Sequence, residues 1–194
     1  GIDISIHSAT KFLGGHSDLI AGAVITKTKE TGAKIYAVQN MTGNMLSPEN
    51  SWLLLRGIKT LRARMQFQAE GAMVIARWLK TRPWVREVYY PGLDDHPGHD
   101  IISRQAKGFG AVVSFKTDSL ERALGLMSNV RIWTVAVSLG GVESILSYPA
   151  KMSHAAIPEK ERGELGITEN LLRLSVGLED PEDLMEDLES ASRA

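Results

Sequence analysis

The sequence predicts an α/β protein, and the part that follows residue 84 is predicted to form an α+β unit. Two observations lead to this prediction. Strand-like runs alternate with helical periods from residue 85 onward, and one long amphipathic period joins them to two strand-like runs in the first 50 residues. At 194 residues the chain is long enough to bury a core and to form one or two domains.

The first 50 residues open on a strand-like alternation. Ile2, Ile4 and Ile6 fall on one face of this run and polar residues fall on the other. A glycine turn separates it from a second predicted strand, "LIAGAVIT" at residues 19–26, which is rich in β-branched and small residues. The polar, glycine-punctuated stretch after it, up to residue 46, is assigned no regular element. Because a fold rarely begins on a strand with no partner nearby, we expect the chain to be a piece of a longer protein.

A long amphipathic helix is predicted from residue 48 to about residue 80. Ser47, Pro48 and Glu49 form a helix-start signal. Apolar residues then recur every three or four positions, which gives a helix one apolar face. The pattern is typical of one helix, or of two joined near Gly71. The apolar positions are Trp52, Leu55, Ile58, Leu61, Met65, Ala69, Met73, Ala76 and Leu79.

The remainder of the chain alternates between strands and helices. Pro83 ends the long helix, and a closing helix begins at Asp180 with a capping aspartate and an acidic first turn. We therefore divide the chain into residues 1–50, a linking helix region at 51–82 and a small domain at 83–194. The predicted elements are strands at 85–90, 111–116 and 132–137, helices at 101–107 and 119–127, a polar loop at 152–166, and a last strand within "NLLRLSVGL" at 170–178.

Composition excludes several classes of function. The 22 Lys and Arg residues are balanced by 23 Asp and Glu residues, so no excess of cations is available for a nucleic acid or an anionic membrane, and neither partner is expected. The absence of cysteine excludes disulfides, thiolate nucleophiles and Cys-ligated zinc. No apolar stretch reaches the roughly 18 residues that a membrane-spanning helix needs. We expect a cytoplasmic protein.

Lys11 lies between a strand-like run and two glycines, and its position has two interpretations. It is either a surface lysine between turn-forming hydroxyls, or an amine that forms a Schiff base in a partly desolvated pocket. In the second case nearby hydroxyls, those of Ser8 and Thr10, would suit a cofactor phosphate. Spacing alone favours the surface interpretation. His96 and His99 share a loop with acidic residues, but such a Pro/Gly-rich loop is usually solvated, and no metal site is predicted.

Five segments resemble one known family. "SATKFLGGHSDLIAG" at residues 8–22 is similar to the cofactor-lysine segment of the pyridoxal-phosphate enzymes of cysteine and methionine metabolism. This family includes cystathionine β-lyase, cystathionine γ-synthase, cystathionine γ-lyase and methionine γ-lyase. The other segments occur in family order over essentially the whole chain, which chance does not explain. They are "NSWLLLRGIKTLRARM" at 50–65, "SLGGVESI" at 138–145, "YPAKMSHA" at 148–155 and "LLRLSVGLED" at 171–180.

The resemblance implies a fold and a set of site residues. The fold is type I of the pyridoxal-phosphate enzymes: the end of a large cofactor domain, the long helix, and a small C-terminal domain with an antiparallel sheet and helices. Lys11 is implied to carry pyridoxal 5′-phosphate as a Schiff base, and Ser8 and Thr10 to bind its phosphate. Arg173 is implied to clamp the α-carboxylate of the substrate with two hydrogen bonds, assisted by Ser138. The leucines that alternate with Arg173 share one strand face, so Arg173 is expected on the other.

The resemblance also implies a carbon–sulfur lyase acting on a sulfur amino acid. Several γ-acting relatives have a glutamate immediately before "SLGG"; here the residue is Val137, which favours a cystathionine β-lyase that forms homocysteine, pyruvate and ammonia. Cystathionine γ-synthase, cystathionine γ-lyase and methionine γ-lyase are the alternatives.

The other cofactor ligands of the family precede the lysine segment, and none is identified in this sequence. We therefore expect the C-terminal half of an enzyme that is a homo-oligomer, a dimer or a tetramer, and we expect this half to be inactive alone. An alternative of another class is a non-catalytic small-domain fragment that self-associates.

Overall fold

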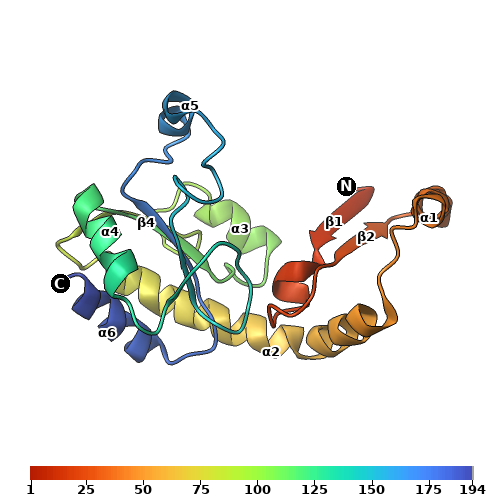
Figure 1. Cartoon of the computed structure of the whole chain (residues 1–194), viewed down its shortest axis with the longest axis horizontal. Coiled ribbons are helices and arrows are strands. Elements are labelled where there is room, and N and C mark those ends of the chain that lie inside the picture. The colour runs from red at the N-terminus through yellow and green to blue at the C-terminus, as the bar shows by residue number, and fades with distance from the viewer. Residues whose placement is uncertain (194) are drawn as a thin grey trace. The chain divides into compact units, whose positions relative to one another are not determined.

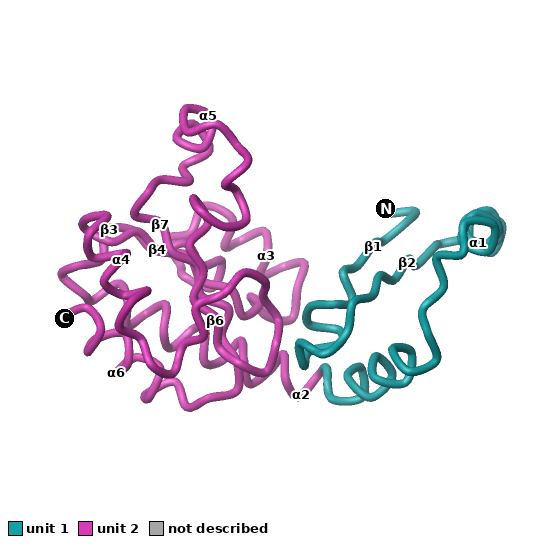
Figure 2. The backbone as a smooth tube through the Cα atoms, in the orientation of Figure 1, with its two compact units in different colours: residues 1–61 teal, residues 62–194 magenta. Residues whose placement is uncertain are grey.

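The computed structural model describes residues 1–193 and divides the chain into two compact units, which Figure 2 colours separately. Unit 1 comprises residues 1–61, and unit 2 begins at Arg62. The division falls within one long helix, α2 (Pro48–Leu79), which contributes its first part to unit 1 and its second part to unit 2. The prediction of this helix is confirmed, and it continues through Gly71 without a break. None of the helices described by the structure has the length and apolarity needed to cross a membrane.

Unit 1 is built on a two-stranded antiparallel hairpin, β1 (Ile4–Ser8) and β2 (Gly22–Thr26) (Figure 1). Ile4 pairs with Thr26 at the open end, and Ser8 pairs with Gly22 next to the connection. The connection contains a short π-helical turn, η1 (Ala9–Leu13). The two predicted strands are therefore confirmed, and the glycine turn between them holds an additional helical turn.

The stretch up to residue 46 that was assigned no regular element contains helix α1 (Lys29–Thr42), and that assignment was wrong. The hydroxyl of Thr28 caps the start of the helix by accepting a hydrogen bond from the backbone N–H of Thr31. Gly43 ends it with a φ of 71°, in the left-handed region that glycine adopts without strain. None of its side chains is buried, so no apolar stripe marks the helix in the sequence.

Unit 2 contains a five-stranded sheet in the order β3-β4-β7-β6-β5. Neighbouring strands are antiparallel except β5 and β6, which are parallel. The strands are β3 (Val85–Tyr89), β4 (Val112–Thr117), β5 (Thr134–Val135), β6 (Ile145–Ser147) and β7 (Leu171–Ser175). Strands β3, β4, β5 and β7 lie within or next to predicted strands. Strand β6 was not predicted, because its three residues lie within and beside the "SLGGVESI" segment and are all buried, which leaves no alternation to detect.

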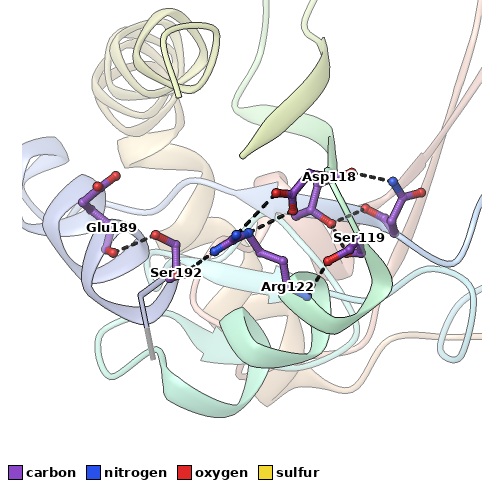
Figure 3. A network of polar contacts seen from close by, with 7 residues as sticks. Asp118, Ser119, Arg122, Glu189 and Ser192 are labelled. Atoms are coloured by element: carbon purple, nitrogen blue, oxygen red, sulfur yellow. Dashed lines mark hydrogen bonds and ion pairs between the residues drawn. The ribbon is translucent and has the colours of Figure 1, made fainter. Parts of the chain in front are cut away.

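Four helices complete unit 2: α3 (His99–Gln105), α4 (Leu120–Asn129), α5 (Glu159–Glu164) and α6 (Pro181–Ala191). The closing helix α6 is confirmed together with its cap, because the Asp180 carboxylate accepts a hydrogen bond from the N–H of Glu182. Helix α5 lies in the segment predicted to be a polar loop. Helices α4 and α6 pack side by side (Figure 1), and Arg122 of α4 joins them by donating to the carbonyl of Ser192 (Figure 3).

The hydrophobic core of unit 2 lies between the sheet and its helices. The second part of α2 buries one apolar stripe in this core, and α4 and α6 bury theirs against it. The sheet supplies alternate residues of β4 and β7. The main buried side chains are Ala72, Ile75, Ala76 and Leu79 from α2; Val113 and Phe115 from β4; Ala123 and Leu126 from α4; Leu172 and Leu174 from β7; and Leu184 and Leu188 from α6.

Candidate active site

In unit 1, Lys11 lies in the middle of the helical turn that connects β1 to β2. Its backbone φ of −91° and ψ of −131° interrupt the helical conformation. Two backbone hydrogen bonds close the turn around it: the N–H of Gly14 donates to the carbonyl of Ala9 at 2.9 Å, and the N–H of Gly15 donates to the carbonyl of Lys11 at 2.8 Å. Ala9 is completely buried and Lys11 is partly buried. The backbone that carries Lys11 is therefore held in place by these two hydrogen bonds.

Helix α2 packs closely against this turn at a glycine. Gly57 is buried, and a Cβ atom at this position would lie 2.2 Å from the carbonyl oxygen of Gly14. Real Cβ atoms do not approach so closely, so only glycine allows the two backbones to come together here. This contact links the "SATKFLGGHSDLIAG" segment to "NSWLLLRGIKTLRARM", and it accounts for the glycine at position 57 of the second segment.

The two hydroxyls predicted to bind phosphate lie in different environments. Thr10 Oγ1 donates to the carbonyl of Ala21 at 3.2 Å and accepts from its N–H at 3.0 Å, so this hydroxyl joins the two ends of the hairpin connection. Ser8 is exposed and makes no capping hydrogen bond at the start of the turn. The Ser8 hydroxyl can therefore turn to a ligand directly, whereas Thr10 would first have to release the Ala21 carbonyl.

In unit 2, Arg173 is a half-buried cation that forms no ion pair with any residue the structure describes. Its Nη2 atom donates to the carbonyl of Ser138 at 2.7 Å and to Oγ of Ser147 at 3.2 Å. Its Nε atom is buried and has no hydrogen-bond partner among the described residues. No carboxylate among those residues forms an ion pair with it, and burial lowers the pKa of the guanidinium from its ordinary value. A buried cation without a counter-ion is costly, so this site favours an anionic ligand.

Ser138 adopts a backbone conformation that is unusual for a residue with a side chain. Its φ is 92°, in the left-handed region. In this conformation the carbonyl of Ser138 accepts the hydrogen bond from Arg173. The carbonyl therefore occupies one side of the guanidinium. Such strained residues persist only where the surrounding structure holds them, and they are frequent at functional sites.

The predicted site residues therefore form two groups. Ser8, Thr10 and Lys11 lie together in the lysine turn of unit 1, and Ser138 contacts Arg173 in unit 2. Sequence reasoning missed Ser147, which faces Arg173 across the pairing of β6 with β7. Ser147 could have been found only from the register of this pairing. That register depends on strand β6, which the sequence pattern does not reveal.

The loop that carries His96 and His99 places His99 against a backbone carbonyl and an aromatic ring. Nδ1 of His99 donates to the carbonyl of Pro91 at 2.9 Å, and the His99 ring stacks on Phe109 with centroids 5.3 Å apart. Within residues 1–193, no group of three or more potential ligand residues is placed to hold a metal ion.

Comparison with known proteins gives one consistent result. The model of the Cys/Met metabolism PLP-dependent enzyme family matches residues 1–193, where PLP denotes pyridoxal 5′-phosphate. The chain is 51% identical to cystathionine γ-lyase and 50% identical to a cystathionine β-lyase, both of Bacillus subtilis, over 98% of its own length. It spans about half the length of the curated relatives it matches, 50% and 49% of these two.

Solved structures agree with this result. The crystal structure of cystathionine γ-lyase from Lactobacillus plantarum complexed with L-serine matches 98% of the chain with a TM-score of 0.95 and 46% identity. That of cystathionine γ-synthase from Xanthomonas oryzae in complex with cystathionine matches all of it with a TM-score of 0.96 and 42% identity. In each case the match covers 50% of the solved chain. The chain therefore belongs to the Cys/Met metabolism PLP-dependent enzymes, and its architecture is that of fold type I.

Proposed function

We propose that the chain is the C-terminal half of a PLP-dependent carbon–sulfur lyase that cleaves cystathionine to homocysteine, pyruvate and ammonia. The observation that carries the proposal is the half-buried guanidinium of Arg173, which has no anionic partner among the described residues. An amino acid substrate brings an α-carboxylate, which would balance this charge. A sulfur amino acid is also what the named relatives act on.

The residues of the lysine turn fit the cofactor. Lys11 supplies a primary amine on a fixed turn, and Ser8 supplies an exposed hydroxyl three residues before it that caps nothing. We propose that Lys11 Nζ holds PLP covalently and that Ser8 donates a hydrogen bond to its phosphate. Thr10 would also donate a hydrogen bond to the phosphate after its hydroxyl turns away from the carbonyl of Ala21.

The chain's own residues then have distinct tasks in the reaction. Arg173 binds the α-carboxylate and so fixes the orientation of the substrate, with Ser138 holding the guanidinium in place. The Lys11 amine, when it is not bonded to the cofactor, would act as the base that accepts the proton from Cα. When bound, PLP supplies an electron-withdrawing ring that accepts the electron pair left at Cα. The bond between Cβ and sulfur breaks, and the sulfur leaves as a thiolate.

The choice of β-cleavage is supported by Val137. This residue directly precedes Ser138, and its exposed side chain offers no carboxylate there. The alternative is a γ-lyase, because the γ-lyase and the β-lyase of B. subtilis are almost equally similar to this chain. Product analysis of the complete enzyme with cystathionine distinguishes the two. Pyruvate supports β-cleavage, and 2-oxobutyrate contradicts it.

Unit 1 supports the proposal that the working enzyme is longer than this chain and oligomeric. A two-stranded hairpin is marginally stable by itself, and this one leaves Ile6 and Ile20 about four-fifths exposed, at 77% and 83%. Met41 of α1 is similarly exposed, at 80%. We propose that the N-terminal half of the enzyme and further copies of it cover this surface in a cytoplasmic homodimer or homotetramer.

Reduction with borohydride tests the proposed function in the complete enzyme. The hydride fixes PLP to its amine, and peptide mapping should locate the label on Lys11. Lys11→Ala should abolish turnover and labelling while leaving the fold intact. The matched control is Lys29→Ala, which removes an exposed lysine at the start of α1 and should change neither. A label on another residue, or normal turnover by Lys11→Ala, would contradict the proposal.

A second candidate is a non-catalytic fragment that self-associates, and the exposed apolar side chains of unit 1 favour it. The mass of the protein isolated from its host decides between the two. A polypeptide about twice as long as this chain supports the enzyme. A stable 21.2 kDa species that forms oligomers and carries no PLP supports the fragment.

A further inference from the structure

A loop in unit 2 holds Arg173 in place, and this loop is itself under backbone strain. It runs from Ser138 to Ser144 and joins β5 to β6. Ser138 has a φ of 92°, a strained conformation for a residue with a side chain. The loop therefore needs contacts outside itself to keep the Ser138 carbonyl on the guanidinium.

Neighbouring elements hold the middle of the loop. The N–H of Gly140 donates to Oγ of Ser175, on β7, at 2.9 Å. The amide of Gln68, a completely buried residue of α2, donates to the carbonyl of Gly141 at 2.7 Å. These contacts hold the loop, but each involves only a single hydrogen bond to a neutral group.

The far end of the loop is held by a carboxylate. Oε1 of Glu179 accepts a hydrogen bond from the N–H of Ser144 at 2.8 Å, and Oε2 accepts one from the Ser144 hydroxyl at 2.7 Å. Ser144 is completely buried, and its hydroxyl also accepts from the N–H of Gly177 at 2.8 Å. Hydrogen bonds to a charged acceptor are roughly twice as strong as neutral ones. The pair of bonds to Glu179 is therefore a stronger attachment than either of the hydrogen bonds at Gly140 and Gly141.

A glycine makes this attachment possible. A Cβ atom on Gly177 would lie 2.3 Å from the carbonyl oxygen of Val142 and 2.5 Å from Oε2 of Glu179. The segment after β7 thus comes so close to the loop that no other residue type fits at this position. Arg173, Gly177 and Glu179 belong to one short segment, so the same stretch of chain supplies the guanidinium and the carboxylate that holds its loop.

We propose that Glu179 is a positioning residue for the carboxylate-binding site of Arg173. By holding Ser144 it keeps the loop in the conformation in which the Ser138 carbonyl occupies Nη2, so that Nη1, which has no partner among the described residues, remains for the ligand. The ligand is a small carboxylate, and its identity as an amino acid substrate rests on the proposed function. Glu179 acts through Arg173 and makes no contact with the ligand.

The test measures carboxylate binding in the complete enzyme with PLP removed, by titration calorimetry with acetate. Glu179→Leu should weaken acetate binding about tenfold, the change expected when a hydrogen bond to a charged group is lost. Glu179→Gln retains one acceptor oxygen and should show a smaller loss. The control is Glu182→Gln, which changes an exposed side chain in the first turn of α6 and should leave acetate binding unchanged.

A double variant separates positioning from general stability. If Glu179 acts through Arg173, then adding Glu179→Leu to Arg173→Ala should cause no further loss of acetate binding. In the PLP-loaded enzyme, Glu179→Leu should raise KM for the amino acid and leave kcat nearly unchanged.

Three results would overturn the proposal. Glu179→Leu could leave acetate binding unchanged, Glu179→Leu could weaken acetate binding equally in the unaltered enzyme and in Arg173→Ala, or the unaltered enzyme could fail to bind acetate. Failure of the proposed function is seen separately, as a lack of turnover of sulfur amino acids by an unaltered enzyme that still binds acetate.

Discussion

Helix α2 meets the lysine turn at Gly57, where the space is too small for a methyl group. Gly57→Ala should therefore push the turn away from the helix. The expected loss of stability is about 1–3 kcal/mol, as for other overpacked sites, and PLP incorporation should fall because Lys11 moves with the turn. Thermal unfolding and the PLP content of the complete enzyme measure the two effects.

Gly125→Ala is the matched control for this prediction. Gly125 also lies within a helix, α4, but nothing lies within 4 Å of the position that its Cβ would take. The substitution should stabilise the protein by up to about 1 kcal/mol, since alanine is the better helix former. If both variants shifted the melting temperature equally, the contact between Gly57 and the turn would not matter.

Ser8 and Thr10 offer a second prediction at the residue scale, because only one of their hydroxyls is engaged by the backbone. Thr10→Val removes both hydrogen bonds to Ala21 and should lower the melting temperature even without PLP, at a cost of about 1 kcal/mol per bond. Ser8→Ala should leave the melting temperature of the PLP-free protein unchanged and raise the dissociation constant of PLP. If Ser8→Ala lowered the melting temperature and Thr10→Val affected only PLP binding, then Ser8 would have the structural role and Thr10 the phosphate-binding role.

At the scale of elements, Arg122 forms a half-buried ion pair with Asp118 at the start of α4, and a separate hydrogen bond from Arg122 links α4 to the end of α6 (Figure 3). Arg122 donates to the Asp118 carboxylate through Nε at 2.9 Å and to the carbonyl of Ser192 through Nη1. The hydrogen bond from Arg122, followed by its positive charge, lowers the pKa of Asp118 below its ordinary value of 3.8. Arg122→Met should therefore cost about 1.5–3 kcal/mol at neutral pH.

The pH dependence of this cost follows from the sign of the shift. A carboxylate whose pKa is lowered in the folded state adds stability above its unfolded pKa, and this contribution is lost as the pH falls through the folded value. The difference between Arg122→Met and the unaltered protein should thus narrow below about pH 4. The bond to Ser192 does not titrate, so part of the difference should remain. Urea unfolding at several pH values checks this, with Arg104→Met, an exposed arginine of α3, as the control.

Elements with local signals could be predicted from the sequence, and those without could not. Helix α6 was predictable because Asp180 caps it and an apolar stripe follows. Helix α1 has caps but no buried stripe, so its polar residues resembled a loop. Strand β6 owes its existence to its pairing with β7, a long-range contact that no local pattern records.

The same distinction applies to the candidate site. Lys11 and Arg173 are carried by short motifs and were found from the sequence, although their roles stay predictions. Ser147 and Glu179 were not found, because the first faces Arg173 only through strand pairing and the second meets Ser144 from 35 positions away. Residues that touch a ligand often lie in recognisable motifs, whereas residues that hold them in place are defined by the tertiary fold.

At the scale of the whole molecule, the buried apolar side chains are distributed very unequally between the units. Those that form the core cluster all lie in unit 2, whereas Ala9 and Leu19 are the buried hydrophobic residues of unit 1 within the described part of the chain. The core of unit 2 also extends beyond the small domain predicted to start at residue 83, because the second part of α2 belongs to it. Independent folding should therefore require this part of the helix.

A polypeptide of residues 62–193 should unfold cooperatively, and one of residues 83–193 should not. The shorter polypeptide lacks Ile75 and Leu79, which are completely buried, together with Ala72 and Ala76. Burial of two large aliphatic side chains contributes about 3–6 kcal/mol, which is comparable to the entire stability of about 5–15 kcal/mol that a domain of this size has. Differential scanning calorimetry distinguishes the two polypeptides. A sharp transition in residues 83–193 would show that the sheet, α4 and α6 form a sufficient core, and that α2 merely connects the two units.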